Sequence, residues 1–160
     1  MIPTIFMKSL MKKIIKEKLE DFKFIKEMKL NKKSLIHDLL VMDYDYNDAL
    51  IELDNLIEWY KSLPEVLELF RIIYVDDYDE INKEEPGSHY SMEKESLLDS
   101  NDFTYGYGDI EILMTIITKK TNIDVQQTLS NNILYPNEKE ITLKNNGKGA
   151  KIINLEIIED

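Results

Sequence analysis

Glu138 and Glu140, two glutamates with one residue between them, have both the type and the spacing that carboxylate catalysis needs. They open the alternating segment 138–144, and the period of two in a β-strand sends Glu138, Glu140 and Thr142 to the same face. Like charges held close raise the pKa of one carboxyl group, and a carboxylate in a cleft stabilises an oxocarbenium ion, as in glycoside hydrolysis. The alternative interpretation is an exposed strand face that carries glutamates.

Arg71 is the only arginine among the 20 basic residues of the chain. It stands in the apolar segment 70–75, where burial of an unpaired charge is costly, so we expect it to have a partner. A guanidinium group matches a carboxylate or a phosphate with two parallel hydrogen bonds, which a lysine does not reproduce. The partner is therefore either an acidic side chain of the protein itself or an anionic ligand.

Ser88, His89, Tyr90 and Ser91 place two hydroxyls, an imidazole and a phenol directly after a Pro-Gly turn. His89 can serve as an acid or a base, although a single histidine is more often a hydrogen-bonded loop residue. The sequence has no spacing typical of a hydrolase triad, no glycine-rich phosphate loop and no calcium-binding loop. We therefore expect no metal site.

The chain has 160 residues and no Cys, which excludes disulfides, thiolate zinc sites and cysteine nucleophiles. Its length fits one domain, and its 43% of hydrophobic residues suffice to fold it. No apolar run approaches the roughly 20 residues of a membrane-spanning helix, and no secretory signal is evident. We expect a soluble, cytoplasmic protein.

The formal net charge of −11 is unevenly distributed. Residues 1–34 carry ten Lys and four acidic residues, a net +6, whereas residues 35–160 carry ten basic and 27 acidic residues, a net −17. The acidic part is expected to repel nucleic acid. The basic segment is either a solvated helix face or a surface for a polyanion, an anionic membrane or the protein's own acidic part.

Apolar periodicity predicts helices first and strands later along the chain. The expected elements are helices at 5–28, 34–40 (capped by Ser34) and 50–60, a helical turn at 65–69, strands at 70–75 and 110–118, an acidic loop at 76–85, a short helix at 92–98, a loop at 101–108, a weaker element at 123–129, and strands at 138–144 and 151–158. This order predicts an α+β fold in a single domain 1–160, with a helical region 1–60 and a strand-rich region 61–160.

Taken in order, Arg71 on the first strand, a serine after a turn and the Glu-x-Glu motif resemble the arginine-serine-glutamate class of mono-ADP-ribosyltransferases, which contains bacterial toxins and phage enzymes. The stretch 135–143, Tyr-Pro-Asn-Glu-Lys-Glu-Ile-Thr-Leu, is the strongest match, and the resemblance covers about residues 60 to 158. Two features differ from the family pattern: Ile72 replaces a small residue after the arginine, and Ser-His-Tyr-Ser replaces Ser-Thr-Ser. The resemblance implies a mostly antiparallel β core with a cleft for NAD in the strand-rich region.

The resemblance also implies that NAD is the substrate, with no metal. Arg71 would bind the pyrophosphate of NAD with two hydrogen bonds. Ser91, or alternatively Ser88, would order the nicotinamide end of the cleft, and Tyr90 would stack on the nicotinamide.

The resemblance assigns catalysis to the two glutamates. Glu140 would contact the nicotinamide ribose and stabilise the transition state, and Glu138 would position or deprotonate the acceptor, most often an arginine of a partner protein. The sequence therefore predicts a mono-ADP-ribosyltransferase that acts on a protein side chain. Two alternatives remain open: an acidic, non-catalytic interaction or inhibitor protein, of the kind a phage encodes, that binds a basic host surface, and a catalytically silent domain of the same fold.

Overall fold

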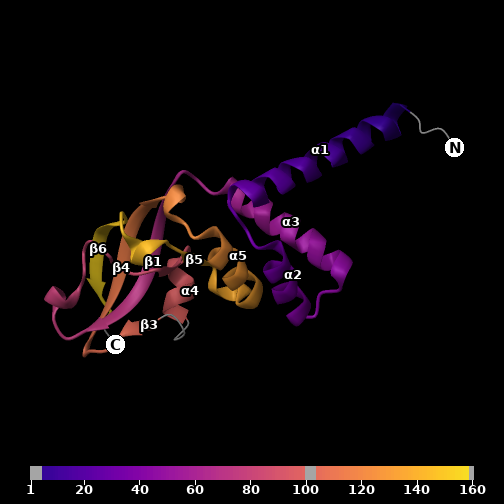
Figure 1. Cartoon of the computed structure of the whole chain (residues 1–160). Coiled ribbons are helices and arrows are strands. Elements are labelled where there is room, and N and C mark those ends of the chain that lie inside the picture. The colour runs from indigo at the N-terminus through magenta and orange to yellow at the C-terminus, as the bar shows by residue number, and fades with distance from the viewer. Residues whose placement is uncertain (1–4, 100–103, 159–160) are drawn as a thin grey trace.

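The structure, a computed structural model, describes residues 5–99 and 104–158. Three helices precede the strands, which confirms the predicted α+β class (Figure 1). The α-helices of the described part are α1 (Ile5–Glu27), α2 (Lys32–Val41), α3 (Tyr46–Ser62), α4 (Lys94–Asp99) and α5 (Val125–Leu134). None of the helices in these two ranges is long and apolar enough to cross a membrane.

The strands form one mostly antiparallel sheet. They are β1 (Val66–Val75), β2 (His89–Ser91), β3 (Thr104–Gly106), β4 (Ile110–Lys119), β5 (Glu140–Thr142) and β6 (Lys151–Ile157). Their order is β5-β2-β1-β4-β6, with β3 beside β1 in the one parallel pairing of the described strands. β1 and β4 form the centre, because they pair along their whole length, from Val66 with Lys119 to Val75 with Ile110.

β1 changes its neighbour partway along. It pairs with β2 at Phe70, opposite Ser91, whereas from Ile72 to Tyr74 it pairs with β3. Arg71 lies between these two pairings. Because β4 occupies the whole of the opposite side of β1, the sheet divides at Arg71 into one arm formed by β2 and β5 and another formed by β3.

One hydrophobic core joins the helices to the sheet. Leu69 of β1, Ile116 of β4 and Leu129 of α5 have no exposed surface, and they belong to the same buried cluster as Leu35 of α2 and Leu53 of α3. Full burial of one large aliphatic side chain contributes about 1.5–3 kcal/mol. The helical region and the strand-rich region therefore stabilise each other.

Two segments differ from their predicted secondary structure. The segment 65–69 is not a helical turn but the start of β1, because Leu67 and Leu69 are buried while Glu68 between them is exposed, which is the period of a strand. The weaker element at 123–129 is helix α5. It begins after Asp124, whose carboxylate accepts a hydrogen bond from the backbone N–H of Gln127 at 3.1 Å.

Three predicted boundaries also shift. Helix α2 begins earlier because its N-cap is Asn31, whose Oδ1 accepts a hydrogen bond from the N–H of Ser34 at 3.0 Å. The expected loop 101–108 contains strand β3, and its residues 101–103 lie outside the described residues. Strand β5 begins at Glu140 instead of Glu138, because Lys139 adopts a left-handed φ of 50° that interrupts the extended backbone.

Helix α5 covers the outer edge of β5. Thr128 Oγ1 accepts a hydrogen bond from the N–H of Thr142 at 3.0 Å and donates one to the C=O of Thr142 at 3.3 Å. Asn132 Nδ2 donates to the C=O of Glu140 at 2.8 Å. A buried strand edge requires such partners for its backbone groups. These bonds hold the backbone of Glu140 in place.

Replacing Thr128 tests this edge. We expect Thr128→Val to lower the free energy of unfolding by about 1–3 kcal/mol, because the buried N–H of Thr142 loses its partner. Urea unfolding measures the change. The matched control is Thr115→Val, the same substitution at a buried threonine of β4. Equal effects of the two substitutions would argue against the capping of β5 by α5.

Candidate functional site

Arg71 lies where the sheet divides, on the face of β1 that otherwise carries the buried Leu69 and Ile73. Its guanidinium carbon is 4.3 Å from the centre of the Tyr105 ring and 5.5 Å from that of Tyr90. In the described part of the chain its buried Nε has no hydrogen-bond partner, and the ion pairs there involve lysines and a histidine only. The two aromatic rings thus stabilise the guanidinium charge, and its Nε remains able to donate a hydrogen bond to an anion.

Backbone packs tightly against Arg71. Gly87 has a φ of 124°, and a Cβ at this position would overlap the guanidinium group. A Cβ at Gly147 would in turn overlap the C=O of Gly87, whose N–H donates to the C=O of Asn146 at 2.9 Å. Only glycine allows both approaches. The turns at 86–87 and 146–147 therefore form a backbone wall beside the guanidinium.

A cavity of about 240 Å³ opens beside Arg71. Its lining includes Tyr105 of β3, Glu85 and Gly87 of the loop after β1, and Asn146. The cavity combines the Arg71 cation with the Tyr105 ring and amide groups, and the carboxylates of Glu80 and Glu85 also line it. It is therefore a polar site of mixed charge, in which Arg71 is the group able to bind an anion.

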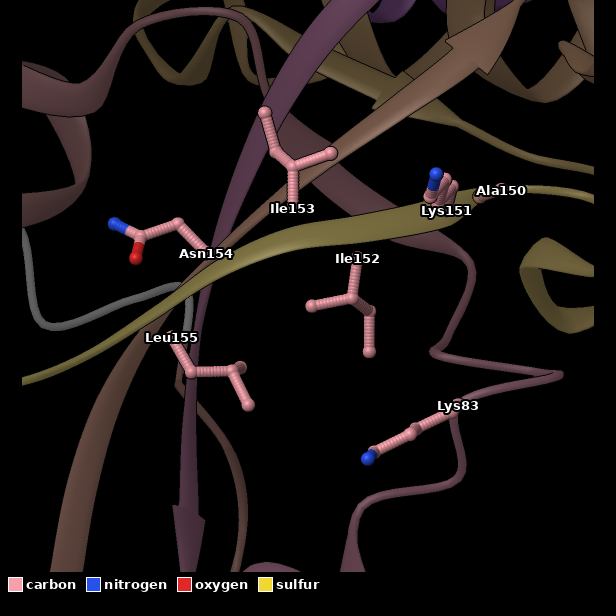
Figure 2. Close-up of a pocket in the computed structure, with 7 residues that line it drawn as sticks. All are labelled: Lys83, Ala150, Lys151, Ile152, Ile153, Asn154 and Leu155. Atoms are coloured by element: carbon pink, nitrogen blue, oxygen red, sulfur yellow. The ribbon is translucent and has the colours of Figure 1, made fainter.

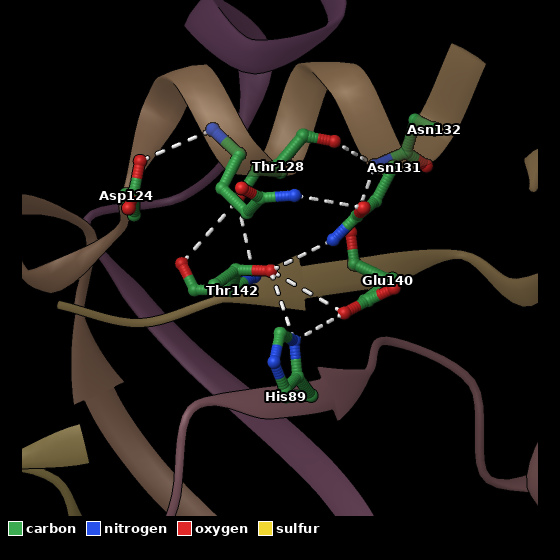
Figure 3. Close-up of polar contacts among 8 residues, drawn as sticks. His89, Asp124, Thr128, Asn131, Asn132, Glu140 and Thr142 are labelled. Carbon is green, nitrogen blue, oxygen red and sulfur yellow. Dashed lines mark hydrogen bonds and ion pairs between the residues drawn. The ribbon is translucent and has the colours of Figure 1, made fainter. Parts of the chain in front are cut away.

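His89 and Glu140 face each other on the other arm of the sheet (Figure 3). His89 Nδ1 lies 2.6 Å from Glu140 Oε1, and Thr142 Oγ1 donates to the same oxygen at 3.3 Å. The Glu140 side chain is 8% exposed and that of His89 is 41% exposed. Both contacts use Oε1, so the second carboxylate oxygen, Oε2, retains its capacity to accept a hydrogen bond from a ligand.

Helix α5 orients this carboxylate through Thr142. Asn131 Nδ2 donates to Thr142 Oγ1 at 3.2 Å (Figure 3), and Gln127 Nε2 donates to Asn131 Oδ1 at 3.0 Å. Because Thr142 Oγ1 already accepts a hydrogen bond, its own proton is directed to Glu140. The chain of donors ends on the carboxylate and fixes its position.

Tyr105 connects the two arms. Its ring stacks on His89 with the centroids 6.0 Å apart and the planes at 14°, and it also contacts Arg71. The pKa of Tyr105 is raised to about 12, first by burial and then by the charge of Glu140, against a lowering by Arg71, and Glu138 adds to the rise. Arg71, His89, Tyr105 and Glu140 thus form one electrostatic unit, here named the fork cluster.

The three other residues predicted to bind NAD lie beside this cluster. Ser91 is buried, and its Oγ lies 3.1 Å from the C=O of Glu93 and 3.1 Å from that of Glu138, so its single hydroxyl proton can bond to either. Tyr90 has no exposed surface and packs beneath Arg71. Ser88 is half-buried, and its C=O accepts a hydrogen bond from the N–H of Leu143 at 2.7 Å. Ser91 therefore joins the end of β2 to the segment before β5.

The prediction that Glu138, Glu140 and Thr142 share one strand face is wrong for Glu138. Glu138 lies in the 3-10 turn Pro136–Glu138, and the left-handed Lys139 breaks the alternation before β5 begins. The predicted exposed face is also absent, because Glu140 and Thr142 are both buried. Both glutamates nevertheless raise the pKa of Tyr105, so both act on the same phenol.

Tyr105 and Asn131 are the members of the site that sequence reasoning missed. For Tyr105 a signal existed in the Tyr-Gly-Tyr-Gly stretch, since Gly106 has a φ of 87° and a Cβ there would lie 2.6 Å from the C=O of Tyr74. That glycine marks a strand running close to β1. For Asn131 no signal existed, because its role depends on the packing of α5 against β5.

A larger cavity, of about 490 Å³, lies along β6 (Figure 2). Its lining includes Ile152, Ile153 and Leu155 of the strand, with Lys83 across from them, and it contains no carboxylate or imidazole. The carboxylate and imidazole groups that lie together are instead those of the fork cluster.

Neither a protein-family model nor a curated protein nor a solved structure matches this chain. Among residues 5–99 and 104–158 there is no group of three or more His, Asp or Glu side chains that could hold a metal ion. The case for a function rests on the motifs and on the geometry of the fork cluster.

Tyr90 provides a test of the electrostatics. Its hydroxyl is buried without a hydrogen bond of ordinary geometry to the described residues, and burial raises its pKa to about 12, against a lowering by Arg71. A phenol with a higher pKa in the folded than in the unfolded state stabilises the fold fully below pH 10.0, and this contribution is lost as the pH rises through about 12.

We expect Tyr90→Phe to change the free energy of unfolding at neutral pH little, because the buried hydroxyl has only a distorted contact with Arg71 to lose. The same variant should lose less stability than the wild type above pH 10.0. Urea unfolding at neutral and alkaline pH measures both. A marked loss of stability at neutral pH would mean that the hydroxyl has a partner in solution.

Proposed function

We propose that this protein is a mono-ADP-ribosyltransferase that moves ADP-ribose from NAD to an arginine side chain of a partner protein. The observation that carries the proposal is the fork cluster, in which the Arg71 guanidinium carbon lies 4.3 Å from the centre of the Tyr105 ring and the Glu140 carboxylate raises the pKa of the same phenol. NAD has an anionic pyrophosphate and, several bonds away, a ribose that becomes cationic on reaction. A cation and a carboxylate separated by aromatic rings suit these two parts.

Arg71 binds the pyrophosphate in this proposal. Its guanidinium lines the cavity of about 240 Å³, and the close approach of Gly87 fixes the guanidinium on one side. The unsatisfied Nε and the planar terminal nitrogens suit two parallel hydrogen bonds to phosphate, which a lysine does not provide. Tyr90 packs against the guanidinium, whose carbon is 5.5 Å from the centre of the ring, and Tyr90 and the neighbouring Ser91 are fully buried, so both support Arg71 from within the protein.

Glu140 stabilises the transition state. The bond between the nicotinamide nitrogen and ribose C1 breaks with its electron pair going to nicotinamide, so positive charge develops on the ribose. With Oε1 held by His89 and Thr142, Oε2 accepts a hydrogen bond from a ribose hydroxyl and the carboxylate faces the developing charge. Because the carboxylate is already oriented, little reorganisation is needed during the reaction.

Glu138 acts on the acceptor. As ribose C1 bonds to a guanidinium nitrogen of the acceptor, that nitrogen must lose one proton, and the Glu138 carboxylate takes it. Its neighbours Asn137 and Lys139 are exposed, so a partner protein can reach this turn. Glu138 itself is half-buried between these exposed neighbours, and in this proposal Glu140 acts on the NAD donor and Glu138 on the acceptor.

Glu140→Gln is the direct test. We expect transfer of labelled ADP-ribose to a lysate protein, or to the protein itself, to fall by about 100-fold or more, since the amide has no charge to stabilise the transition state. NAD binding by calorimetry and thermal unfolding should stay close to wild type. Glu68→Gln, an exposed carboxylate of β1, is the matched control and should transfer normally. Wild-type transfer by Glu140→Gln would refute the proposal.

Arg71→Lys tests the proposed contact with the pyrophosphate of NAD. It keeps the charge but removes the planar pair of donors, so we expect the dissociation constant for NAD to rise about 10-fold or more. Calorimetry with NAD gives this value directly. Unchanged affinity for NAD in Arg71→Lys would place the pyrophosphate elsewhere.

His89 is a positioning residue for Glu140. We expect His89→Ala to lower kcat about 10-fold with little change in the KM for NAD, because the carboxylate remains but loses one of its two fixed contacts. His89→Asn can donate an N–H to the same oxygen and should recover part of the rate. An effect mainly on KM would instead assign His89 to NAD binding.

One observation favours the second function, an acidic protein that binds a basic host surface without catalysis. The six acidic residues of the segment 76–85 are all exposed. This cluster would steer a cationic partner in a salt-dependent way. Absence of transfer and of NAD binding in the wild type, with salt-sensitive binding of a basic protein, would support this alternative.

A further inference from the structure

The outer part of helix α1 extends away from the rest of the molecule (Figure 1). Only toward its C-terminal end does it pack firmly: Phe24 is buried against Tyr60 with the ring centroids 5.7 Å apart, and Asp21 pairs with Lys61 at 3.1 Å. Further out, Leu10 and Met11 are 46% and 51% exposed. Large apolar side chains on a projecting helix are typical of an interaction surface.

An apolar notch lies at the base of the same helix, between α1 and α3. It has a volume of about 490 Å³, and its apolar lining comes from Phe22 and Ile25 of α1 and from Leu50, Ile51 and Leu53 of α3. Phe22 and Ile51 are 67% and 60% exposed. One chain therefore carries both a projecting apolar helix and an apolar notch.

The helix and the notch have complementary charge. Residues 5–16 contain four lysines and no acidic residue, whereas α3 contains four acidic residues and one lysine. Asp21 and Asp54 line the notch together with Lys32. Asp54 is the acidic residue that α3 contributes to this lining, and Asp21 already pairs with Lys61. A basic helix with an apolar side therefore fits an apolar notch that lies beside the acidic helix α3.

We propose that the protein forms a two-fold dimer in which residues 5–16 of each copy lie in the notch of the other. In this arrangement the two α1 helices run antiparallel, and Leu10 and Met11 of one copy cover Phe22 and Ile51 of its partner. A two-fold axis makes each contact twice, so a single arrangement covers both surfaces of both copies. An anionic membrane would account for the lysines but would leave the notch uncovered. The dimer does not depend on the proposed enzymatic function.

The mass of the full-length protein in solution is the first measurement. We expect sedimentation equilibrium at micromolar concentration to give twice the 18.9 kDa of the chain. The double variant Leu10→Gln with Met11→Gln should raise the dimer dissociation constant about 100-fold, because the two-fold axis applies each lost contact twice. Ile51→Gln, on the notch side, should act in the same direction.

The matched control removes two apolar side chains of similar exposure from β6. Ile153 and Ile157 are 45% and 48% exposed, and Ile153→Gln with Ile157→Gln should leave the dimer intact. A monomer at all concentrations would overturn the proposal. So would a dimer that survives the helix variant or is lost in the β6 variant, and so would a monomer that binds anionic vesicles through the same lysines.

Cross-linking locates the interface. The chain has no Cys, so introduced cysteines react specifically. Mixing Leu10→Cys chains with Ile51→Cys chains and adding a short bis-maleimide should give a cross-linked pair, which can only form between two copies. A pair that fails to form while the wild type is dimeric would place the interface elsewhere and overturn the proposal.

Discussion

At Arg71 the central strand β1 exchanges one hydrogen-bonded neighbour for another, and the candidate site takes its shape from that exchange. A continuous sheet would place side chains on flat faces and leave no gap between strands. Since β2 pairs with β1 at Phe70 and β3 takes over at Ile72, the two arms bring Tyr105 and His89 together beside the arginine. Because β1 pairs with β4 along its whole length, the strand remains continuous through this change of partner, and the central pair of strands is not interrupted.

The carboxylate of the site depends on elements far from it in sequence. Helix α5 bonds to the edge of β5 and, through Asn131 and Thr142, to the Glu140 side chain. The helix is held in turn by α2, where Ser130 Oγ donates to Asp38 Oδ2 at 2.7 Å. The helical region thus supports the position of Glu140 as well as the core. Folding and site geometry are therefore coupled, because the same hydrogen bonds serve both.

The boundary between the basic and the acidic parts of the chain does not coincide with the boundary between the helical and the strand-rich regions. The acidic part, residues 35–160, contains the site and an exposed acidic loop, while the lysine-rich helix α1 projects from it. Within the fork cluster, by contrast, the one arginine lies against two aromatic rings, and it takes part in none of the ion pairs among the described residues. The charge on the surface and the charge in the site therefore come from different parts of the structure.

The amino-acid sequence by itself determined the α+β class, the long helices and the central strands, because apolar periodicity acts locally. It also singled out Arg71 and Glu140 as candidate site residues, which the structure places around the same phenol. It did not distinguish the strand at 66–69 from a helical turn, since that choice depends on pairing with β4. Nor did it place Glu138 outside β5 or Tyr105 within the site. These follow from one left-handed residue, Lys139, and from the approach of β3 to β1. Only the tertiary structure decides them, because the hydrogen bonds and ring contacts involved join residues that lie far apart along the chain.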